Sequence, residues 1–309
     1  MRSSLQTIAG VISLAVTAQA AYSSQLIYQF PDYLQWVENM AVRPNGNILI
    51  TTFDHAHIYE LNPTSGSAPR LVAALPDADA SIGIAEIGPD VFAVEAGFLN
   101  RSDYHLEGTG RIDVIDFTCI SGGLPKVKTA AHYPQAKLPN GMAALPLFSH
   151  ILLSADSITG TIYRINTDTG VIDVALQDPK LAPMPNPDPF LSLLGVNGLK
   201  IHGQYLYVTS SSGQFLGRYL IDAEGNPLRD LEILVEYPTP RSPDDFAVAQ
   251  NGTIFGAVPL TSVSKVTTDH NVDYIINYND NFQRPTAVAL SRDEKTVYVS
   301  TGGSKRSWG

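Results

Sequence analysis

A short segment type recurs six times along this 309-residue chain. Its copies begin at Glu38, Ile82, Asn140, Asn197, Asp244 and Pro285, and in each copy one lead residue is followed by mostly apolar residues. The lead residues are 44, 58, 57, 47 and 41 positions apart, and most copies are followed by a turn and a second apolar strand. Repeats of roughly 40 to 50 residues made of short strands are typical of β-propeller blades. We therefore predict an all-β chain that folds as a six-bladed β-propeller.

The first repeat shows the expected blade most clearly. An inner strand over 39–43 is followed by Pro44-Asn45-Gly46, a strong hairpin signal. Strands are then expected over 47–52, 57–61 and 69–75. The third and fourth repeats follow the same plan, so one blade contains four strands.

The last repeat is short, because only 302–309 follow its second strand. The segment 25–30 alternates between apolar and polar residues like a strand. We predict that it forms the outermost strand of the last blade and that 304–308 forms the third. The ring would then close between the N- and C-terminal strands, which removes exposed strand edges.

The first 20 residues have the features of a secretory signal peptide. Arg2 gives a basic start, 8–16 is apolar but too short to span a bilayer, and Ala18-Gln19-Ala20 is a cleavage signal. We expect a mature chain over 21–309 that forms a single propeller domain in the secretory pathway or outside the cell. The two sequons, at Asn100 and Asn251, are expected glycosylation sites and agree with passage through the secretory pathway.

Charge and cysteine content exclude several classes of partner and of stabilisation. The formal net charge is −10 and no long basic run occurs, which argues against nucleic acid and anionic membranes as partners. Cys119 is the only cysteine, so an intramolecular disulfide is impossible. Stability must come from burial and ring closure, and the expected partners are small apolar molecules.

Four lead residues carry oxygen ligands: Glu38, Asn140, Asn197 and Asp244. Equivalent positions in a propeller point toward one axis. Two carboxylates and two amide carbonyls suit Ca²⁺, with waters completing its shell. Asn and Asp also form turns before strands, but four such residues in register favour a ring that can hold a divalent cation. The lead positions Ile82 and Pro285 cannot bind a metal.

Two connections are too long to be plain turns, and we expect both on the face of the lead residues. They cover 95–110 and 177–196. We predict a pocket on this face whose substrate-binding residues come from the loops and the nearby strand ends: Trp36, Phe53, His55, Phe98, Tyr104, His105, Phe190 and Phe215. The sequence contains no Gly-x-Ser-x-Gly, His-Glu-x-x-His, P-loop or dinucleotide-binding motif, so no organic cofactor is expected.

The quartet at the heads of inner strands, in Trp36-Val37-Glu38, Asn140-Gly141, Asn197-Gly198 and Asp244-Asp245, resembles the senescence marker protein/gluconolactonase/paraoxonase superfamily. The resemblance covers essentially the whole mature chain. It implies a six-bladed propeller with a divalent metal over the channel, where the metal polarises a lactone or ester carbonyl in hydrolytic members. The catalytic residues implied are the same four that hold the metal. Asp245 is a departure, because the family usually has glycine there.

A narrower resemblance rests on the leader and on the segments 26–31, 36–43 and 297–303. These look like fungal secreted propellers of natural-product pathways, including the hetero-Diels–Alderases of tropolone sesquiterpenoid biosynthesis. This resemblance implies a cyclase that joins a tropolone quinone methide to a terpene alkene. Metal-dependent lactone or ester hydrolysis is the alternative, and a secreted binding module is a third reading, because fold does not determine function.

Overall fold

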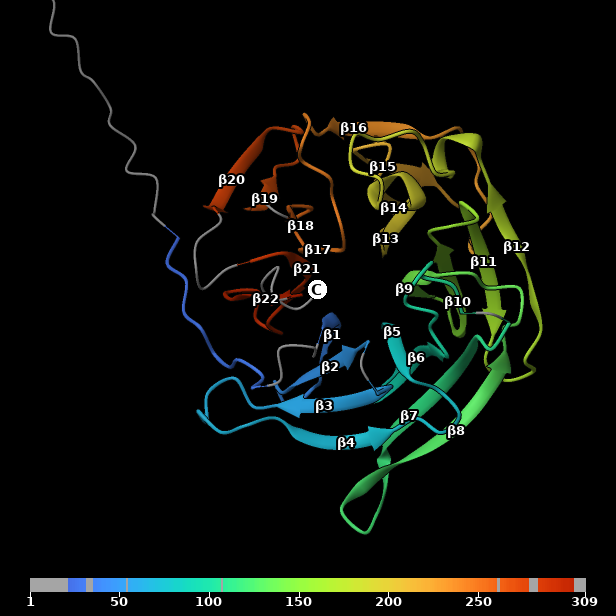
Figure 1. The fold of residues 1–309 in the computed structure, drawn as a ribbon, viewed down its shortest axis with the longest axis vertical. Helices are drawn as coiled ribbons and strands as arrows, with labels where there is room; N and C mark the ends of the chain where they lie inside the picture. Colours follow the sequence, from blue (N-terminus) through green and yellow to red (C-terminus); the bar gives the residue numbers. More distant parts are fainter. Residues whose placement is uncertain are drawn as a thin grey trace, which may run out of the picture.

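The computed structural model describes residues 22–31, 36–53, 55–106, 108–259, 262–277 and 283–302. Within these residues, five four-stranded antiparallel sheets and one two-stranded sheet surround a common axis (Figure 1). In each four-stranded sheet the first strand lies nearest the axis and the later strands follow outward. The prediction of an all-β propeller is confirmed.

We number the four-stranded sheets as blades in chain order. Blade one contains β1 (Val37–Val42), β2 (Ile48–Thr52), β3 (His57–Leu61) and β4 (Arg70–Ala74). Blade two contains β5 (Ala80–Gly88), β6 (Val91–Gly97), β7 (Arg111–Ser121) and β8 (Leu124–His132). Blade three contains β9 (Pro139–Leu145), β10 (Phe148–Asp156), β11 (Thr161–Asn166) and β12 (Ile172–Gln177).

Blade four contains β13 (Val196–His202), β14 (Tyr205–Ser210), β15 (Phe215–Leu220) and β16 (Glu232–Glu236). Blade five contains β17 (Phe246–Val248), β18 (Ile254–Val258), β19 (Ser262–Val266) and β20 (Val272–Asn277). The remaining two strands, β21 (Pro285–Leu290) and β22 (Val297–Thr301), form what we call the terminal sheet. Two short 3₁₀ helices, Pro179–Leu181 and Leu191–Leu193, lie in the loop between blades three and four.

Turn chemistry sets the local strand boundaries. In blade one, the Arg43 N–H donates to Asn47 O at 2.8 Å and Gly46 has a φ of +85°. Glycine adopts such a φ without steric cost, so Pro44-Asn45-Gly46 forms the predicted turn. The predicted strand 57–61 is confirmed as β3, and its neighbours differ from prediction by at most two residues.

The hydrophobic core is divided among the contacts between neighbouring sheets. Between blades one and two, Leu49 of β2 and Phe92 of β6 are fully buried in one cluster. Between blades four and five, Leu216 packs in one cluster with Phe246. Because the apolar clusters lie between neighbouring sheets, the ring is stabilised by radial repetition without a central core.

The terminal sheet lies between blades five and one. On one side, the Asp245 N–H donates to Thr286 O at 3.1 Å. On the other side, Thr286 Oγ1 donates to the carbonyl of Val37 at 2.9 Å. These contacts place β21 beside the inner strands of both neighbouring blades.

The N-terminal segment does not form the predicted outermost strand. Residues 25–30 have no strand conformation. Their aromatic side chains pack on blade one instead, where Phe30 meets Tyr59 edge to face with ring centroids 5.2 Å apart. Side-chain packing therefore replaces the strand pairing that alternation suggested. The predicted third strand, 304–308, lies outside the described residues.

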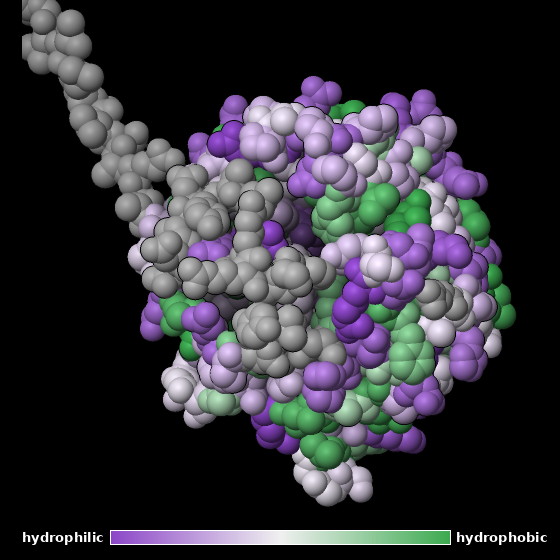
Figure 2. All heavy atoms as spheres, in the orientation of Figure 1, coloured by the Kyte–Doolittle hydropathy of each residue, from purple (hydrophilic) through white to green (hydrophobic). Residues whose placement is uncertain are grey.

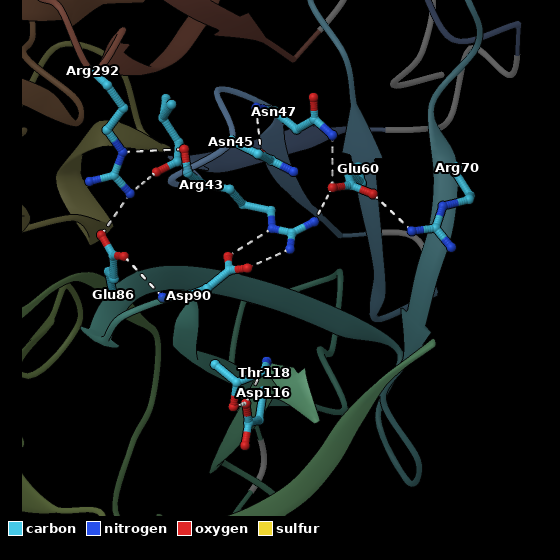
Figure 3. A network of polar contacts seen from close by, with 11 residues as sticks. Arg43, Asn45, Asn47, Glu60, Arg70, Glu86, Asp90, Asp116, Thr118 and Arg292 are labelled. Atoms are coloured by element: carbon cyan, nitrogen blue, oxygen red, sulfur yellow. Dashed lines mark hydrogen bonds and ion pairs between the residues drawn. The ribbon is translucent and has the colours of Figure 1, made fainter. Parts of the chain in front are cut away.

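A network of arginines and carboxylates lies at the end of β1 away from Glu38 (Figure 3). The Arg43 guanidinium donates to Asp90 at 2.9 and 2.6 Å and also to Glu60. Arg292, in the turn of the terminal sheet, donates to the carbonyls of Val42 and Arg43 and to Glu86. This arginine network thus connects the terminal sheet with blades one and two.

Candidate functional site

Each lead residue can be identified in the structure from the strand pairing of the residue that comes directly before it. These preceding residues pair with the end of the second strand, as Val37–Thr52, Ser81–Ala96, Pro139–Asp156, Val196–Ser210 and Pro285–Thr301. Pro285 thus precedes a lead residue, as Pro139 and Pro243 do. The lead residue of the terminal sheet is Thr286, and the prediction of Pro285 is wrong by one position. Both residues are compatible with the local apolar pattern, so only the strand pairing decides between them.

Glu38, Asn140, Asn197 and Asp244, which we call the polar quartet, lie near one another in the structure. The side chain of Asn140 hydrogen-bonds to Glu38, and that of Asn197 hydrogen-bonds to Asp244. Asn197 Nδ2 also donates to Ser211 Oγ at 2.9 Å. The quartet therefore consists of two carboxyl–amide pairs.

Electrostatic coupling joins the two pairs. Burial is the main cause that raises the pKa of Glu38 to about 7, and the charge of Asp245 adds to it, while hydrogen bonds from Trp36 and Asn140 oppose it. Burial and then the negative charges of Glu38 and Asp245 raise the pKa of Asp244 well above its usual range. Because the charge of Glu38 raises the pKa of Asp244, and that of Asp245 raises both, the three carboxyls lie in one site.

The polar quartet fits a divalent cation. Asn140 Oδ1 and Asn197 Oδ1 are buried, and neither accepts a hydrogen bond from any described residue. Such orphaned acceptors are costly unless a partner fills the site, and amide and carboxylate oxygens are the ligands that Ca²⁺ prefers. Among the described residues, no group of three or more His, Cys, Asp and Glu can hold a metal ion. The two amide oxygens are therefore essential to this fit.

A third carboxyl, that of Asp245, lies beside the quartet. Both oxygens of the buried Asp245 accept from Lys200 Nζ, at 2.6 and 2.7 Å. In the sequence, this position was marked only by an aspartate where the resembling family usually has glycine. Its partner Lys200 is 45 residues away, so the local pattern gave no sign of the ion pair. Because Asp245 is paired with Lys200, the carboxyls left to bind a cation at the quartet are those of Glu38 and Asp244.

The lead position of blade two is apolar and supports the two long loops. Ile82 is fully buried and packs with Leu99 and Leu106 of one loop and Leu194 of the other. Above them, Tyr104 and Phe190 meet edge to face with ring centroids 4.8 Å apart. The two loops thus meet over a lead residue, as predicted. Figure 2 shows hydrophobic residues on this face over β13 and near β5, beside a hollow at the ring axis.

A second aromatic pair comes from blade one. Trp36 stacks on Phe53 with ring centroids 6.2 Å apart and planes 10° apart. Its indole lies directly on the backbone of Gly302, where a Cβ would come within 2.6 Å of the ring. Trp36 Nε1 donates to Glu38 Oε2 at 2.6 Å. Trp36 therefore connects the aromatic side of the site with the polar quartet.

Phe215 does not line this face. Its side chain is 4% exposed and belongs to the core between blades three and four. Phe215 is the first residue of β15, so its side chain points into the contact between sheets, and its assignment to substrate binding is wrong. A position at a strand end is insufficient to tell the pocket from the inter-blade core.

The other predicted substrate-binding residues lie in the surrounding loops. Phe98 is 47% exposed. His55 is exposed, and its ring centroid is 5.3 Å from that of His57. His105 Nδ1 lies 3.3 Å from Asp103 Oδ2 within its own loop. These contacts place Phe98, His55 and His105 around the face and outside the quartet.

The two sequon asparagines differ in their surroundings. Asn100 is partly buried, and its Oδ1 accepts from both the N–H and the hydroxyl of Ser102. Asn251 is exposed in the turn between β17 and β18 and accepts from the Thr253 N–H at 2.9 Å. Asn251 is therefore the more accessible of the two.

A cavity of about 290 Å³ lies away from the polar quartet. Its lining includes Ile87, Val114, Lys126 and His150, at the end of blades two and three opposite the lead residues. No helix among the described residues is long and apolar enough to cross a membrane.

The chain is similar in sequence to two curated fungal proteins, and no family model matches it. One is named "Putative hetero-Diels-Alderase asR5" from Sarocladium schorii, 27% identical over 251 residues that make up 74% of this chain and 59% of that protein. The other is named "Putative hetero-Diels-Alderase" from Phoma sp., 26% identical over 305 residues, 88% of this chain and 84% of that protein. The match thus spans less than two thirds of the Sarocladium protein.

Solved propellers share the fold at low sequence identity. Calcium-binding regucalcin from Agrobacterium tumefaciens superimposes with a TM-score of 0.58 at 18% identity, covering 83% of this chain and 78% of that one. A gluconolactonase from Xanthomonas campestris gives 0.60 at 13% identity, with 87% and 84% covered. The resemblance drawn from the sequence is confirmed: the chain resembles hetero-Diels–Alderases in sequence and the gluconolactonase and regucalcin propellers in fold.

Proposed function

We propose that this chain is a cyclase of fungal secondary metabolism that catalyses an intermolecular hetero-Diels–Alder cycloaddition. The heterodiene would be a tropolone quinone methide, and the alkene would come from a terpene. The observation that carries the proposal is the similarity, over most of this chain, to two proteins whose names give this reaction. The aromatic pairs beside a buried polar quartet support it, because they suit an apolar ligand with one polar end.

The reaction makes modest demands on the protein. One C–O bond and one C–C bond form together, no atom leaves and no proton must move. Holding both partners at reacting distance removes much of the entropic barrier. In this proposal, Tyr104 and Phe190 on one side and Trp36 and Phe53 on the other hold the apolar partners. These rings belong to packed pairs, so they are preorganised for binding.

The polar quartet would bind the oxygen end of the heterodiene. Charge develops on this oxygen as the new bonds form, and donors aimed at it stabilise the transition state. Glu38 in its acid form is such a donor, held in position by Trp36. A Ca²⁺ ion, when bound by the quartet, would supply Lewis acidity at the same place.

We take the terminal sheet as the inner half of a sixth blade, because it bonds to blades five and one through Thr286. We also propose entry into the secretory pathway with cleavage after Ala20 and glycosylation at Asn251. Intact-mass analysis of protein from a eukaryotic host tests both, and a retained Met1 would contradict the location.

The test of the reaction uses the purified mature chain with a tropolone quinone methide, generated in solution, and a sesquiterpene alkene. Because the uncatalysed addition also proceeds, the rate and the enantiomeric excess of the adduct are compared with those obtained with heat-denatured protein. A faster reaction that yields one enantiomer supports the proposal. A racemic adduct at the uncatalysed rate would refute it.

Metal-dependent lactone or ester hydrolysis is the second candidate, favoured by the orphaned oxygens of Asn140 and Asn197. It requires the cation for chemistry, whereas the cyclase requires it at most for polarisation or stability. Lactone turnover that a chelator abolishes and Ca²⁺ restores, without cycloaddition activity, would favour the hydrolase. Each activity must be paired with a melting curve, because the loss of a stabilising ion resembles a catalytic defect.

A further inference from the structure

Arg101, in the loop between β6 and β7, hydrogen-bonds to three segments of the chain. Its Nη2 donates to the carbonyl of Phe53, the residue after β2, at 2.5 Å. Its Nη1 donates to Asp79 Oδ2 at 2.8 Å and to Leu99 O at 3.3 Å. Phe53 belongs to blade one, Asp79 to the connection between blades one and two, and Leu99 to the loop. A guanidinium has several donors in one plane, so a single side chain can join these segments.

Asp79 holds the same loop from the side of the connection. Its Oδ1 accepts the Leu99 N–H at 2.7 Å, and its own N–H donates to Gly97 O at 3.0 Å. Its Oδ2 accepts from Arg101, so both carboxylate oxygens bind the loop. The start of the loop is therefore fixed against the connection between blades one and two.

Arg101 and Tyr104 lie in one tight turn. Asn100 and His105 pair as an antiparallel bridge, and the Tyr104 N–H donates to Asn100 O at 2.8 Å. Tyr104 has a φ of +59°, which residues other than glycine adopt rarely. Such a conformation persists where the surrounding structure holds it, and it is found most often at functional sites. The place of Tyr104 thus depends on where Arg101 holds the turn.

The residue that Arg101 binds in blade one belongs to the other aromatic pair. The Phe53 N–H donates to Trp36 O at 3.1 Å, and its carbonyl accepts from Arg101, so both main-chain groups of Phe53 are bonded. The rings of Phe53 and Tyr104 pack against the same buried cluster, which contains Ile82. Arg101 therefore links the two aromatic pairs through their main chains.

We propose that Arg101 is a positioning residue of this site: it sets the place of the Trp36–Phe53 pair relative to the Tyr104–Phe190 pair. In the cycloaddition, the two pairs hold the two reaction partners. Their relative position then determines the distance between the reacting atoms and the face on which the alkene is attacked. This role rests on the proposed function, whereas the contacts of Arg101 do not.

The exposure of the ion pair separates positioning from stability. The side chains of Arg101 and Asp79 are 45% and 35% exposed, and ion pairs at such positions contribute little to the free energy of unfolding. Turnover is more sensitive, because a displacement of about 1 Å can cost on the order of a hundredfold in rate. Loss of Arg101 should therefore change the reaction much more than the melting temperature.

Two arginine variants make the comparison. Arg101→Met keeps most of the side-chain length and removes the donors. Arg70→Met is the matched control, because Arg70 is 55% exposed and also donates to a carboxylate, Glu60, and to a main-chain carbonyl, that of Gly123, at the end away from the lead residues (Figure 3). We expect both variants to melt within about 4 °C of the parent chain. With saturating substrates, Arg101→Met should turn over on the order of tenfold more slowly and give a lower enantiomeric excess, whereas Arg70→Met should match the parent.

Hydrogen exchange followed by mass spectrometry tests the contacts of Arg101 without the reaction. Peptides that contain the amides of Phe53 and Leu99 should exchange faster in Arg101→Met than in the parent, and at the parent's rate in Arg70→Met. Arg101→Lys keeps a charge for Asp79 but lacks the planar fork, so its turnover, enantiomeric excess and exchange should be intermediate. If Arg101→Met does not fold, Arg101→Lys still decides.

Three results would overturn the proposal. In the first, Arg101→Met matches the parent in turnover and enantiomeric excess. In the second, Arg70→Met loses as much turnover as Arg101→Met, which would show a general effect of removing a surface arginine. In the third, exchange at Phe53 and Leu99 is the same in Arg101→Met and the parent. Absence of cycloaddition in the parent would refute the proposed function, and faster exchange in Arg101→Met would still support Arg101 as the residue that holds the aromatic pairs in place.

Discussion

Replacing Gly83 with alanine tests how closely the inner strands approach one another at the axis. A Cβ there would lie 2.1 Å from Asn140 O and 2.3 Å from Glu95 Oε2, whereas real Cβ contacts essentially never fall below 3.0 Å. The nearer atom is main chain of the next blade, so no side-chain rotation can relieve the clash. Overpacking costs about 1 to 3 kcal/mol, and more where backbone must shift. We expect Gly83→Ala to lower the free energy of unfolding by about 3 kcal/mol.

The same strand provides a matched control. A Cβ at Gly88, also in β5, would have its nearest neighbour at an ordinary 3.8 Å. Gly88→Ala should therefore be neutral or stabilise by up to about 1 kcal/mol, because alanine restricts the unfolded chain. Urea unfolding of both variants gives the difference in their free energies of unfolding, provided that these free energies fall with urea concentration at the same slope. Equal midpoints for the two variants would show that the inner strands are not packed this closely.

The other predictions concern the ion, the aromatic wall and the arginine network. Ca²⁺ should stabilise the parent chain, by about 2.7 kcal/mol at 100 times its Kd, and should stabilise Asp244→Asn much less; equal effects would place the ion elsewhere. Phe190→Ala should lower cycloaddition turnover at least about tenfold at unchanged Tm. Phe148→Ala, with the same 39% exposure at the opposite end of the propeller, should leave turnover unchanged. Equal turnover in the two variants would show that Phe190 does not bind the substrate. Arg292→Ala should lower the free energy of unfolding by about 1 to 3 kcal/mol through the loss of its hydrogen bonds, whereas Lys295→Ala, at a side chain 82% exposed, should change it by less than about 0.5 kcal/mol. Equal melting of these two variants would mean that the network does not stabilise the ring.

Much of the blade pattern was predictable because it depends on local information. Alternating apolar residues and the turn at Gly46 identify strands within a few residues of one another in sequence. The spacing of the lead residues then indicated which strands lie at the axis. The same reasoning failed at 25–30, because alternation shows that a segment can be a strand but not whether an edge is there to pair with it.

The candidate site was predictable only in part. Glu38, Asn140, Asn197 and Asp244 were identifiable because each heads a repeat. Phe215 was assigned to the site although it is a core residue, since strand ends lie beside both the face and the contact between sheets.

The sequence by itself determined the repeat, the strand pattern and the residue types that head the inner strands, because these follow from periodicity and turn chemistry along the chain. Only the tertiary structure decided that Thr286 is the last lead residue, that Lys200 pairs with Asp245, and that Gly83 lies against the carbonyl of Asn140. Each of these depends on which strands meet at the axis and in what register. Strand pairing and close backbone approach bring together residues far apart in sequence, and the local pattern contains no information about them.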